Sequence, residues 1–247
     1  MDSARQLEYL EALGIKAWLP RDMPVQADRQ ELPVEIRSEK PVGNLAEEPI
    51  PPIELTESPG DVSTLGWEEL SACVRACTNC GLHAGRTQAV FGVGNRQAEL
   101  MVIGEAPGAD EDKQGEPFVG RAGLLLNEIL FAVGYPRETV YIANIVKCRP
   151  PENRNPQHEE AQACAGYLQR QIELVAPKAI LALGKVAAQN LLRTDLPIGK
   201  MRGSQYHYAA LNIPVVVTYH PAYLLRSPKE KQKVWQDMQL LNRLLDA

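Results

Sequence analysis

The sequence has 247 residues, of which 45% are hydrophobic, enough for one main domain with an appendage. Its formal net charge of −5 by itself argues against a nucleic-acid partner, since proteins that bind phosphates usually carry a basic excess. No run is long and apolar enough to span a membrane, and the first residues lack the pattern of a secretory signal peptide. We therefore expect a cytoplasmic protein without a membrane partner.

Residues 1–23 form the first predicted unit, an amphipathic peptide. Its apolar side chains are Leu7, Leu10, Leu13, Ile15 and Trp18. A hydrophobic peptide ahead of a long linker is typical of partner capture, and the alternative is a short helix that docks on its own domain. We predict partner binding through Leu10, Leu13, Ile15 and Trp18.

Residues 24–66 form the second predicted unit, an acidic, Pro-rich linker. The stretch carries a net charge of −6 and seven of the 19 prolines, and it has no aromatic residue. Such a composition buries too little apolar surface to offset chain entropy, so we predict a disordered linker. Because the rest of the chain then sums to +1, the overall negative charge no longer excludes a nucleic-acid partner.

Residues 67–247 form the third predicted unit, in which apolar runs alternate with helical patterns. Helices are predicted over residues 67–80, 121–134 and 156–176. Strands are predicted within the Val- and Ile-rich runs 99–106, 139–146, 178–184 and 213–220. Continuous apolar runs of this length are typical of strands buried on both faces of a parallel sheet, so the expected class is α/β.

The five cysteines are Cys73, Cys77, Cys80, Cys148 and Cys164. Disulfides are not expected in a cytoplasmic chain, and the C-x-x-C spacing of Cys77 and Cys80 is typical of a metal site or a redox pair. Four cysteines suit one zinc ion or one iron–sulfur cluster, and spacing does not separate the two. Cys73 lies one helical turn before Cys77 and could replace a neighbouring ligand. The alternative is a set of buried thiols that bind nothing.

Polar motifs follow three of the predicted strands. GEAPG (104–108) follows the first, NIVKCRPPENRNP (144–156) the second and HPAYLLR (220–226) the last. In α/β sheets, ligands bind at the carboxyl ends of the strands. We therefore expect the three motifs to meet at one pocket.

Together with the cysteines, the motifs GEAPGADED, GEPFVGRAG, ANIVKCRPPENRNP and HPAYLLR resemble those of the family-four uracil-DNA glycosylases. The resemblance covers roughly Trp67 to the C-terminus. It implies a three-layer sandwich with a central, mostly parallel four-stranded sheet between helices, and removal of uracil from DNA. It also implies a [4Fe-4S] cluster, structural in role, on Cys77, Cys80, Cys148 and Cys164. Cys73 then becomes the extra thiol.

The resemblance implies a pocket that encloses a uracil flipped out of the DNA. Asn144 would read the base, because its amide donates to O4 and accepts from N3–H, whereas cytosine presents the opposite pattern. Phe118 would stack on the base. His220 would donate to O2, where negative charge grows as the glycosidic bond breaks.

The turn after the first strand would approach the substrate with its backbone, through Gly104, Ala106 and Gly108. Glu105 is the first candidate to activate the attacking water or to stabilise the sugar cation, and Glu111 is the second. The family-one enzymes carry an aspartate at the place of Ala106, so the general base stays open. Candidates for phosphate contacts are Arg121, Arg149, Arg154, Arg202 and Arg226.

The segment LEYLEALGIKAWLPRD (7–22) is similar to the N-terminal peptide of the psi subunit of bacterial DNA polymerase III, which binds the clamp-loader collar. This resemblance implies Trp18 as an anchor, with the clamp loader and the chi subunit as partners. Two functions follow: a glycosylase tethered to the replication machinery, or a psi-type subunit whose glycosylase-like domain is a binding module with little catalysis. A ferredoxin-like electron carrier is a third reading, which leaves Asn144, Phe118 and His220 without a use.

Overall fold

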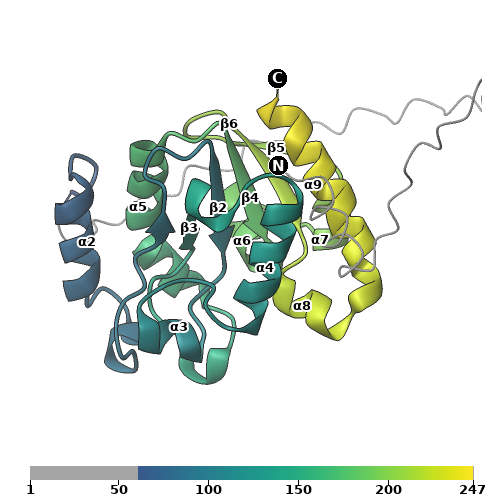
Figure 1. Ribbon diagram of the computed structural model, residues 1–247. Helices are drawn as coiled ribbons and strands as arrows, with labels where there is room; N and C mark the ends of the chain where they lie inside the picture. The colour runs from purple at the N-terminus through teal and green to yellow at the C-terminus, as the bar shows by residue number, and fades with distance from the viewer. Residues whose placement is uncertain (1–60, 247) are drawn as a thin grey trace, which may run out of the picture. The chain divides into compact units, whose positions relative to one another are not determined.

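The computed structural model describes residues 61–246, so the predicted N-terminal peptide and nearly all of the predicted linker lie outside the described residues. One sheet runs through this region in the order β1-β3-β2-β4-β6-β5 (Figure 1). Its strands are β1 (Val93–Gly94), β2 (Leu100–Gly104), β3 (Tyr141–Asn144), β4 (Ala179–Leu183), β5 (Gln205–Tyr208) and β6 (Ile213–Thr218). The α-helices are α2 (Trp67–Ala76), α3 (Ala109–Gln114), α4 (Arg121–Ala132), α5 (His158–Val175), α6 (Gly184–Leu192), α7 (Ile198–Met201), α8 (Pro221–Arg226) and α9 (Lys231–Leu245). Short 3₁₀ turns are η1 (Gly81–Ala84), η2 (Arg137–Thr139), η3 (Pro151–Asn153) and η4 (Pro228–Glu230).

The four predicted strands form the parallel centre of the sheet, with β3, β2, β4 and β6 as neighbours. The α/β class is therefore confirmed, but the expected number of strands was too small. Two further strands pair antiparallel at the edges, β1 with β3 and β5 with β6. β1 has only two residues and β5 is polar, with exposed residues in alternation, so neither carries the continuous apolar run of a buried strand.

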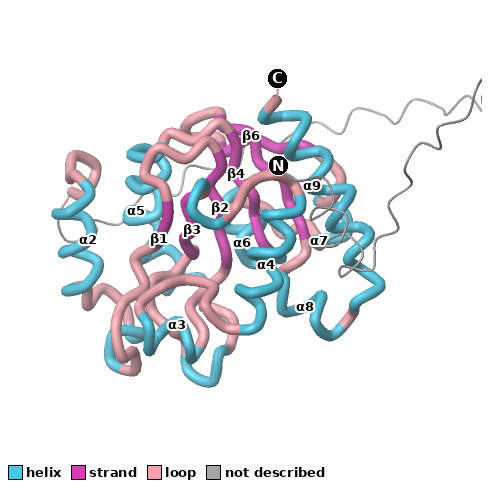
Figure 2. The backbone as a smooth tube through the Cα atoms, viewed as in Figure 1, coloured by secondary structure: helices cyan, strands magenta, loops and turns pink. Residues whose placement is uncertain are grey.

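Alternate residues of the central strands face two separate apolar clusters. In β2, Met101 and Ile103 pack with residues of α2, α5 and α6, whereas Leu100 and Val102 pack with α4, α8 and α9. The strands are thus buried on both faces, with helices covering each face (Figure 2). Each fully buried aliphatic side chain contributes about 1.5–3 kcal/mol, which explains why the strand sequences are apolar throughout.

The helix predicted over residues 67–80 is shorter than expected. It ends at Ala76, so Cys77 and Cys80 lie in the turn that follows. Trp67 holds this helix against the sheet, because its ring lies 5.2 Å from the ring of Tyr141 and 6.1 Å from that of Phe91. The two cysteines therefore directly follow a helix that is packed against β3, the strand that carries Asn144.

The path of the chain determines where polar residues collect. From β2 the chain passes to β3 on one side, and it then returns across β2 to β4 on the other side. The carboxyl ends of β3, β2, β4 and β6 consequently share one edge, and such reversals are where α/β sheets bind ligands. Within residues 61–246, no helix combines the length and the hydropathy needed to cross a bilayer.

Candidate active site

The predicted site residues Asn144 and Phe118 meet at Gly104, the last residue of β2, and His220 lies next to Phe118. Gly104 lies opposite Asn144 in the parallel register of β2 and β3. A Cβ atom on Gly104 would lie 2.5 Å from Asn144 Oδ1 and 2.6 Å from Phe118 Cζ, so only glycine lets the amide and the ring approach here. The Phe118 ring also lies 5.6 Å from the His220 ring, centroid to centroid. We call Gly104, Glu105, Phe118, Asn144 and His220 the Asn144 site.

The Asn144 side chain is buried and only partly satisfied. Its exposed fraction is 2%, and its Oδ1 atom has no hydrogen-bond partner among the described residues. A buried acceptor left unpaired costs about 1–3 kcal/mol, so this atom is held ready for a donor that the protein itself does not supply. An N–H group of a ligand placed between the amide and the Phe118 ring would provide it.

His220 follows β6 and caps the first turn of α8. Its Nδ1 accepts a hydrogen bond from the Ala222 backbone N–H at 3.2 Å, so in the neutral ring the proton is on Nε2. Burial lowers the pKa of His220 to about 4. The positive charge of Arg226 also lowers this pKa, whereas the carboxylate of Glu111 raises it. Near pH 7 the ring is therefore neutral and offers one N–H donor.

Gly184, which the sequence reasoning missed, supports His220 from the end of β4. Its φ of +90° is in the region that favours glycine, and a Cβ there would lie 3.0 Å from the Cβ of His220. The signal in the sequence was a glycine at the end of the predicted strand run 178–184. A side chain at this position would strain the backbone and force His220 to shift.

Glu105 is the first residue after β2. Burial raises the pKa of its carboxyl group to about 7, so the group can exchange a proton near neutral pH. The backbone around it is fixed, because the Gly104 and Glu105 carbonyls accept from the N–H groups of Ile145 and Val146 at 2.9 and 3.2 Å. These bonds extend the pairing of β2 and β3 beyond their ends and hold Glu105 beside Asn144.

Glu111, the other predicted acid, has a different environment. Its carboxylate accepts from the backbone N–H of Gly108 at 3.0 Å, of Val119 at 3.0 Å and of Gly120 at 3.1 Å, and both oxygens take part. The side chain thus joins the turn after β2 to the loop that carries Phe118. These contacts favour a positioning role for Glu111, which leaves Glu105 as the acid with an available carboxyl group.

The remaining turn residues, Ala106 and Gly108, lie on the same segment as Glu105. Ala106 is partly buried against the apolar cluster that includes α2 and α5. Gly108 caps the start of α3, where its N–H donates to Glu111. Contact of their backbone with a substrate stays a prediction.

The four predicted cysteine ligands come from three separate segments and collect at one apolar cluster. Cys148 and Cys164 are buried in it, and Cys77 and Cys80 pack against it. Electrostatic interactions link Cys148 with Cys77 and Cys80, and Cys164 with Cys148 and Cys77. In the side-chain positions of residues 61–246, however, no three His, Cys, Asp or Glu residues form a group that could hold a metal ion. Cys73 is exposed on α2.

The surroundings of the cysteines suit thiolates. The Arg86 guanidinium donates to Cys148 Sγ at 2.9 Å, and the Lys147 backbone N–H donates to Cys164 Sγ at 3.3 Å. Burial raises the pKa of both thiols, that of Cys164 to about 12, so they ionise near pH 7 only if a bound metal replaces the proton. Lys147 is only 1% exposed. Burial lowers the pKa of its ammonium group to about 8, and negative charge on Cys164 and Cys148 opposes this lowering, so the group is still mostly protonated near pH 7. A buried cation beside these sulfurs fits an anionic metal–thiolate group. We call Cys77, Cys80, Cys148, Cys164 and Lys147 the cysteine region.

The arginines proposed for phosphate contacts divide into two groups. Arg202 is paired with the buried Asp237 at 2.7 Å, and Arg154 with Glu160 at 2.6 Å, so both support the fold. Arg121 at the start of α4 and Arg226 at the end of α8 are exposed. Arg149 is partly exposed and donates to Asn153 at 2.8 Å.

Comparison with known proteins defines the class to which this fold and site belong. Residues 91–239 match the family model described as the uracil DNA glycosylase superfamily. This span includes every residue of the Asn144 site and two of the four predicted cysteine ligands. The chain therefore belongs to the uracil-DNA glycosylase superfamily.

Individual relatives place the chain more closely, with the type-4 members. It is 43% identical over 177 residues to the type-4 uracil-DNA glycosylase of Archaeoglobus fulgidus, a match that covers 69% of this chain and 89% of the relative. It is 47% identical over 161 residues to the type-4 enzyme of Thermotoga maritima, covering 65% and 83%. The type-4 enzyme of Pyrobaculum aerophilum is 40% identical over 190 residues, covering 72% and 97%.

Proposed function

We propose that this protein is a DNA-repair glycosylase that hydrolyses the N-glycosidic bond of uracil in DNA. The observation that carries the proposal is the buried Oδ1 of Asn144, which has no partner among the described residues and lies with the Phe118 ring against Gly104, in a chain similar to type-4 uracil-DNA glycosylases. A uracil N3–H is the donor that this oxygen lacks. Cytosine has no proton on N3 and presents an amino group where uracil has O4, so the amide discriminates between the two bases.

The site holds the base between fixed groups. Phe118 supplies an apolar face for stacking, which is worth about 1–3 kcal/mol per base. The amide of Asn144 reads the N3 and O4 edge, and Gly104 leaves the space that both side chains need. The uracil must leave the duplex or come from a single strand to reach these groups.

Bond cleavage places negative charge on the departing base. As the C1′–N1 bond breaks, its electron pair passes to the uracil ring and charge grows on O2. The neutral His220 ring donates from Nε2 to O2, a bond that is stronger in the transition state than in the ground state. A water molecule then adds to C1′ and gives its proton to Glu105, whose raised pKa suits a base near neutral pH. The products are free uracil and an abasic site.

We also propose that the cysteine region holds a [4Fe-4S] cluster on Cys77, Cys80, Cys148 and Cys164. The thiol environment and the buried cation of Lys147 support it. The cluster would cross-link the segment after α2, the loop after β3 and α5, and it would take no part in a hydrolysis that moves no electrons. Cys148 lies four residues after Asn144, so this cross-link would fix the loop beside the base-reading residue.

The proposed activity is tested with cluster-loaded protein and a labelled single-stranded oligonucleotide that contains one uracil. After alkaline treatment, cleavage at the uracil is expected with the wild type. We expect about 100-fold slower cleavage with His220→Ala, the loss seen when one donor to a developing anion is removed. His207→Ala, a change in an exposed histidine of β5, is the matched control and should cleave normally. Absence of cleavage by the wild type would overturn the proposal and favour the psi-type binding module.

The N-terminal peptide is proposed to tether the enzyme to the replication machinery, with Trp18 as its anchor to the clamp-loader collar. The sequence pattern of residues 7–22 supports this proposal. Trp18→Ala should weaken co-purification with clamp-loader subunits and leave uracil release unchanged. Equal co-purification of both proteins would contradict the tether while leaving the glycosylase proposal intact.

A further inference from the structure

Phe118 is held in an unusual backbone conformation. Its φ is +55°, in the left-handed region that few side chains other than glycine, asparagine and aspartate adopt. The conformation turns the ring toward Gly104, and Gly123 of α4 approaches so closely that a Cβ there would overlap the Phe118 carbonyl. Such a conformation persists only where the surrounding contacts enforce it.

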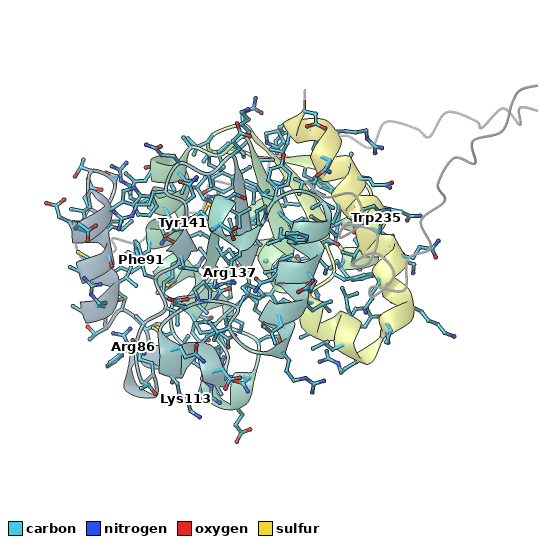
Figure 3. All side chains as sticks on the ribbon, viewed as in Figure 1. Arg86, Phe91, Lys113, Arg137, Tyr141 and Trp235 are labelled. Atoms are coloured by element: carbon cyan, nitrogen blue, oxygen red, sulfur yellow. The ribbon has the colours of Figure 1, made fainter. Side chains whose placement is uncertain are left out.

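Arg137 supplies contacts on the carbonyl side of this loop. The residue begins η2, just before β3, and its side chain is labelled in Figure 3. Its Nη2 donates to the Pro117 carbonyl at 2.7 Å, and its Nη1 donates to the Phe118 carbonyl at 3.2 Å. Nη1 also lies 3.3 Å from Asn127 Oδ1 on α4. One guanidinium group therefore fixes two consecutive peptide carbonyls and the adjacent helix.

Glu111 supplies the complementary contacts on the amide side. The next two N–H groups along the loop, those of Val119 and Gly120, donate to its carboxylate. Four successive residues, 117–120, are thus held by opposite charges, with carbonyls on a cation and amides on an anion. Charged hydrogen bonds are roughly twice as strong as neutral ones, so the pair can enforce a strained conformation between them.

We propose that Arg137 is a positioning residue for uracil excision, which acts with Glu111 to hold the Phe118 ring in place for stacking on the flipped base. The inference rests on the proposed function of Phe118 as the stacking wall. Arg137 does not touch the substrate, and its effect passes through the 117–120 backbone. Because a displacement of about 1 Å in a catalytic group can reduce a rate about 100-fold, loss of this contact should affect the chemical step.

The test is a double-mutant cycle in single-turnover uracil excision from a single-stranded oligonucleotide. Arg137→Ala and Phe118→Ala should each slow excision about 10-fold to 100-fold, and the double variant should be no slower than Phe118→Ala alone. The affinity of Arg137→Ala for the same oligonucleotide without uracil should match that of the wild type. Arg170→Ala is the matched control, since Arg170 is a partly buried arginine that donates to the Leu65 carbonyl on another part of the fold.

A second variant keeps the test valid if Arg137→Ala does not fold. Arg137→Lys retains the charge but cannot bridge both carbonyls with a planar fork, so it should fold and still lose part of the rate. Multiplicative defects in the double variant, or normal excision by Arg137→Lys and Arg137→Ala, would overturn the inference. Normal excision by Phe118→Ala would instead remove the stacking role on which it rests, while uracil release by the wild type would still support the glycosylase.

Discussion

The Asn144 site and the cysteine region both include residues at or just after the carboxyl end of β3, but they differ in how their polar groups are paired. At Asn144 a buried oxygen lacks a partner, Glu105 is desolvated, and Phe118 has a left-handed backbone. Around the cysteines, Arg86 and the Lys147 backbone already donate to two sulfurs. Unpaired and strained groups are typical of sites that bind a ligand transiently, whereas paired groups are typical of permanent structure. The difference supports the proposals of a catalytic role for the first region and a structural role for the second.

The side chain of Lys147 links the cysteine region to the Asn144 site. Its Nζ donates to the Asn144 backbone carbonyl at 3.0 Å and to Gln171 Oε1 at 2.5 Å. Gln171, on α5, donates in turn to the Phe91 carbonyl at 2.8 Å and lies 3.2 Å from the Tyr141 hydroxyl. The backbone of Asn144, the proposed base-reading residue, is therefore held by a buried hydrogen-bond network that starts beside the cysteines. Because Lys147 bonds to the backbone carbonyl, the network leaves the Asn144 Oδ1 atom without a partner among the described residues.

The largest effect is expected for Asn144→Ala. The change removes the amide that we propose reads N3 and O4 and would leave those substrate atoms unpaired, so uracil excision should fall about 1,000-fold. Iron content and the thermal unfolding midpoint should stay close to those of the wild type, because Oδ1 has no partner among the described residues. Single-turnover excision, iron analysis and thermal unfolding measure the three quantities.

The control for this variant is Asn190→Ala, which removes an exposed amide from α6 and should leave excision unchanged. A loss of iron in Asn144→Ala comparable to the loss of activity would break the division of roles between the two regions.

The second largest effect is expected in the cysteine region, from Cys80→Ser. The change should release iron, bleach the visible absorbance and lower the free energy of unfolding by roughly 3 kcal/mol or more, since a metal that binds only the folded chain stabilises it. Cys73→Ser is a matched variant only seven residues away, and Cys73 is exposed. It should keep its iron. If Cys73→Ser lost the iron and Cys80→Ser kept it, the ligand set would have to be redrawn.

The sequence was sufficient to predict that Gly104, Asn144, Phe118 and His220 lie close together, because each of them stands next to a strand end or in a short motif. Their roles stay predictions. The edge strands could not be predicted, because two residues in β1 and a polar run in β5 carry no signal of burial. The role of Arg137 was also inaccessible, since it contacts carbonyl groups 19 and 20 residues away in the chain, and backbone carbonyls leave no trace in a sequence. The sequence placed Glu105 ahead of Glu111, but for the same reason it could not predict that backbone N–H groups occupy the Glu111 carboxylate.

The smallest effect is expected for Glu105→Gln, which tests the proposed catalytic role of the Asn144 site. If Glu105 accepts the proton of the attacking water it must be ionised, so wild-type excision should rise with pH up to about 7 and then level off. The low pKa of His220, about 4, keeps that ring from adding a second limb near neutral pH. Glu105→Gln should be about 10-fold to 100-fold slower and should lose the rise, as followed by single-turnover rates across the pH range.

The same substitution should act on stability in the opposite direction. The carboxyl pKa is raised in the folded protein from 4.5 to about 7, so the unfolded state ionises first and the folded state loses stability as the pH rises between these values. Glutamine has no charge to desolvate, and Glu105→Gln should therefore unfold at a higher temperature than the wild type above pH 7 and at a similar temperature near pH 4. Asp110→Asn, a change in an exposed acid of α3, should show neither effect. A Glu105→Gln protein that was both slower and less stable at high pH would mean that the carboxylate stabilises the fold. Glu105 would then be a structural residue, and the proposed difference between the Asn144 site and the cysteine region would not hold for it.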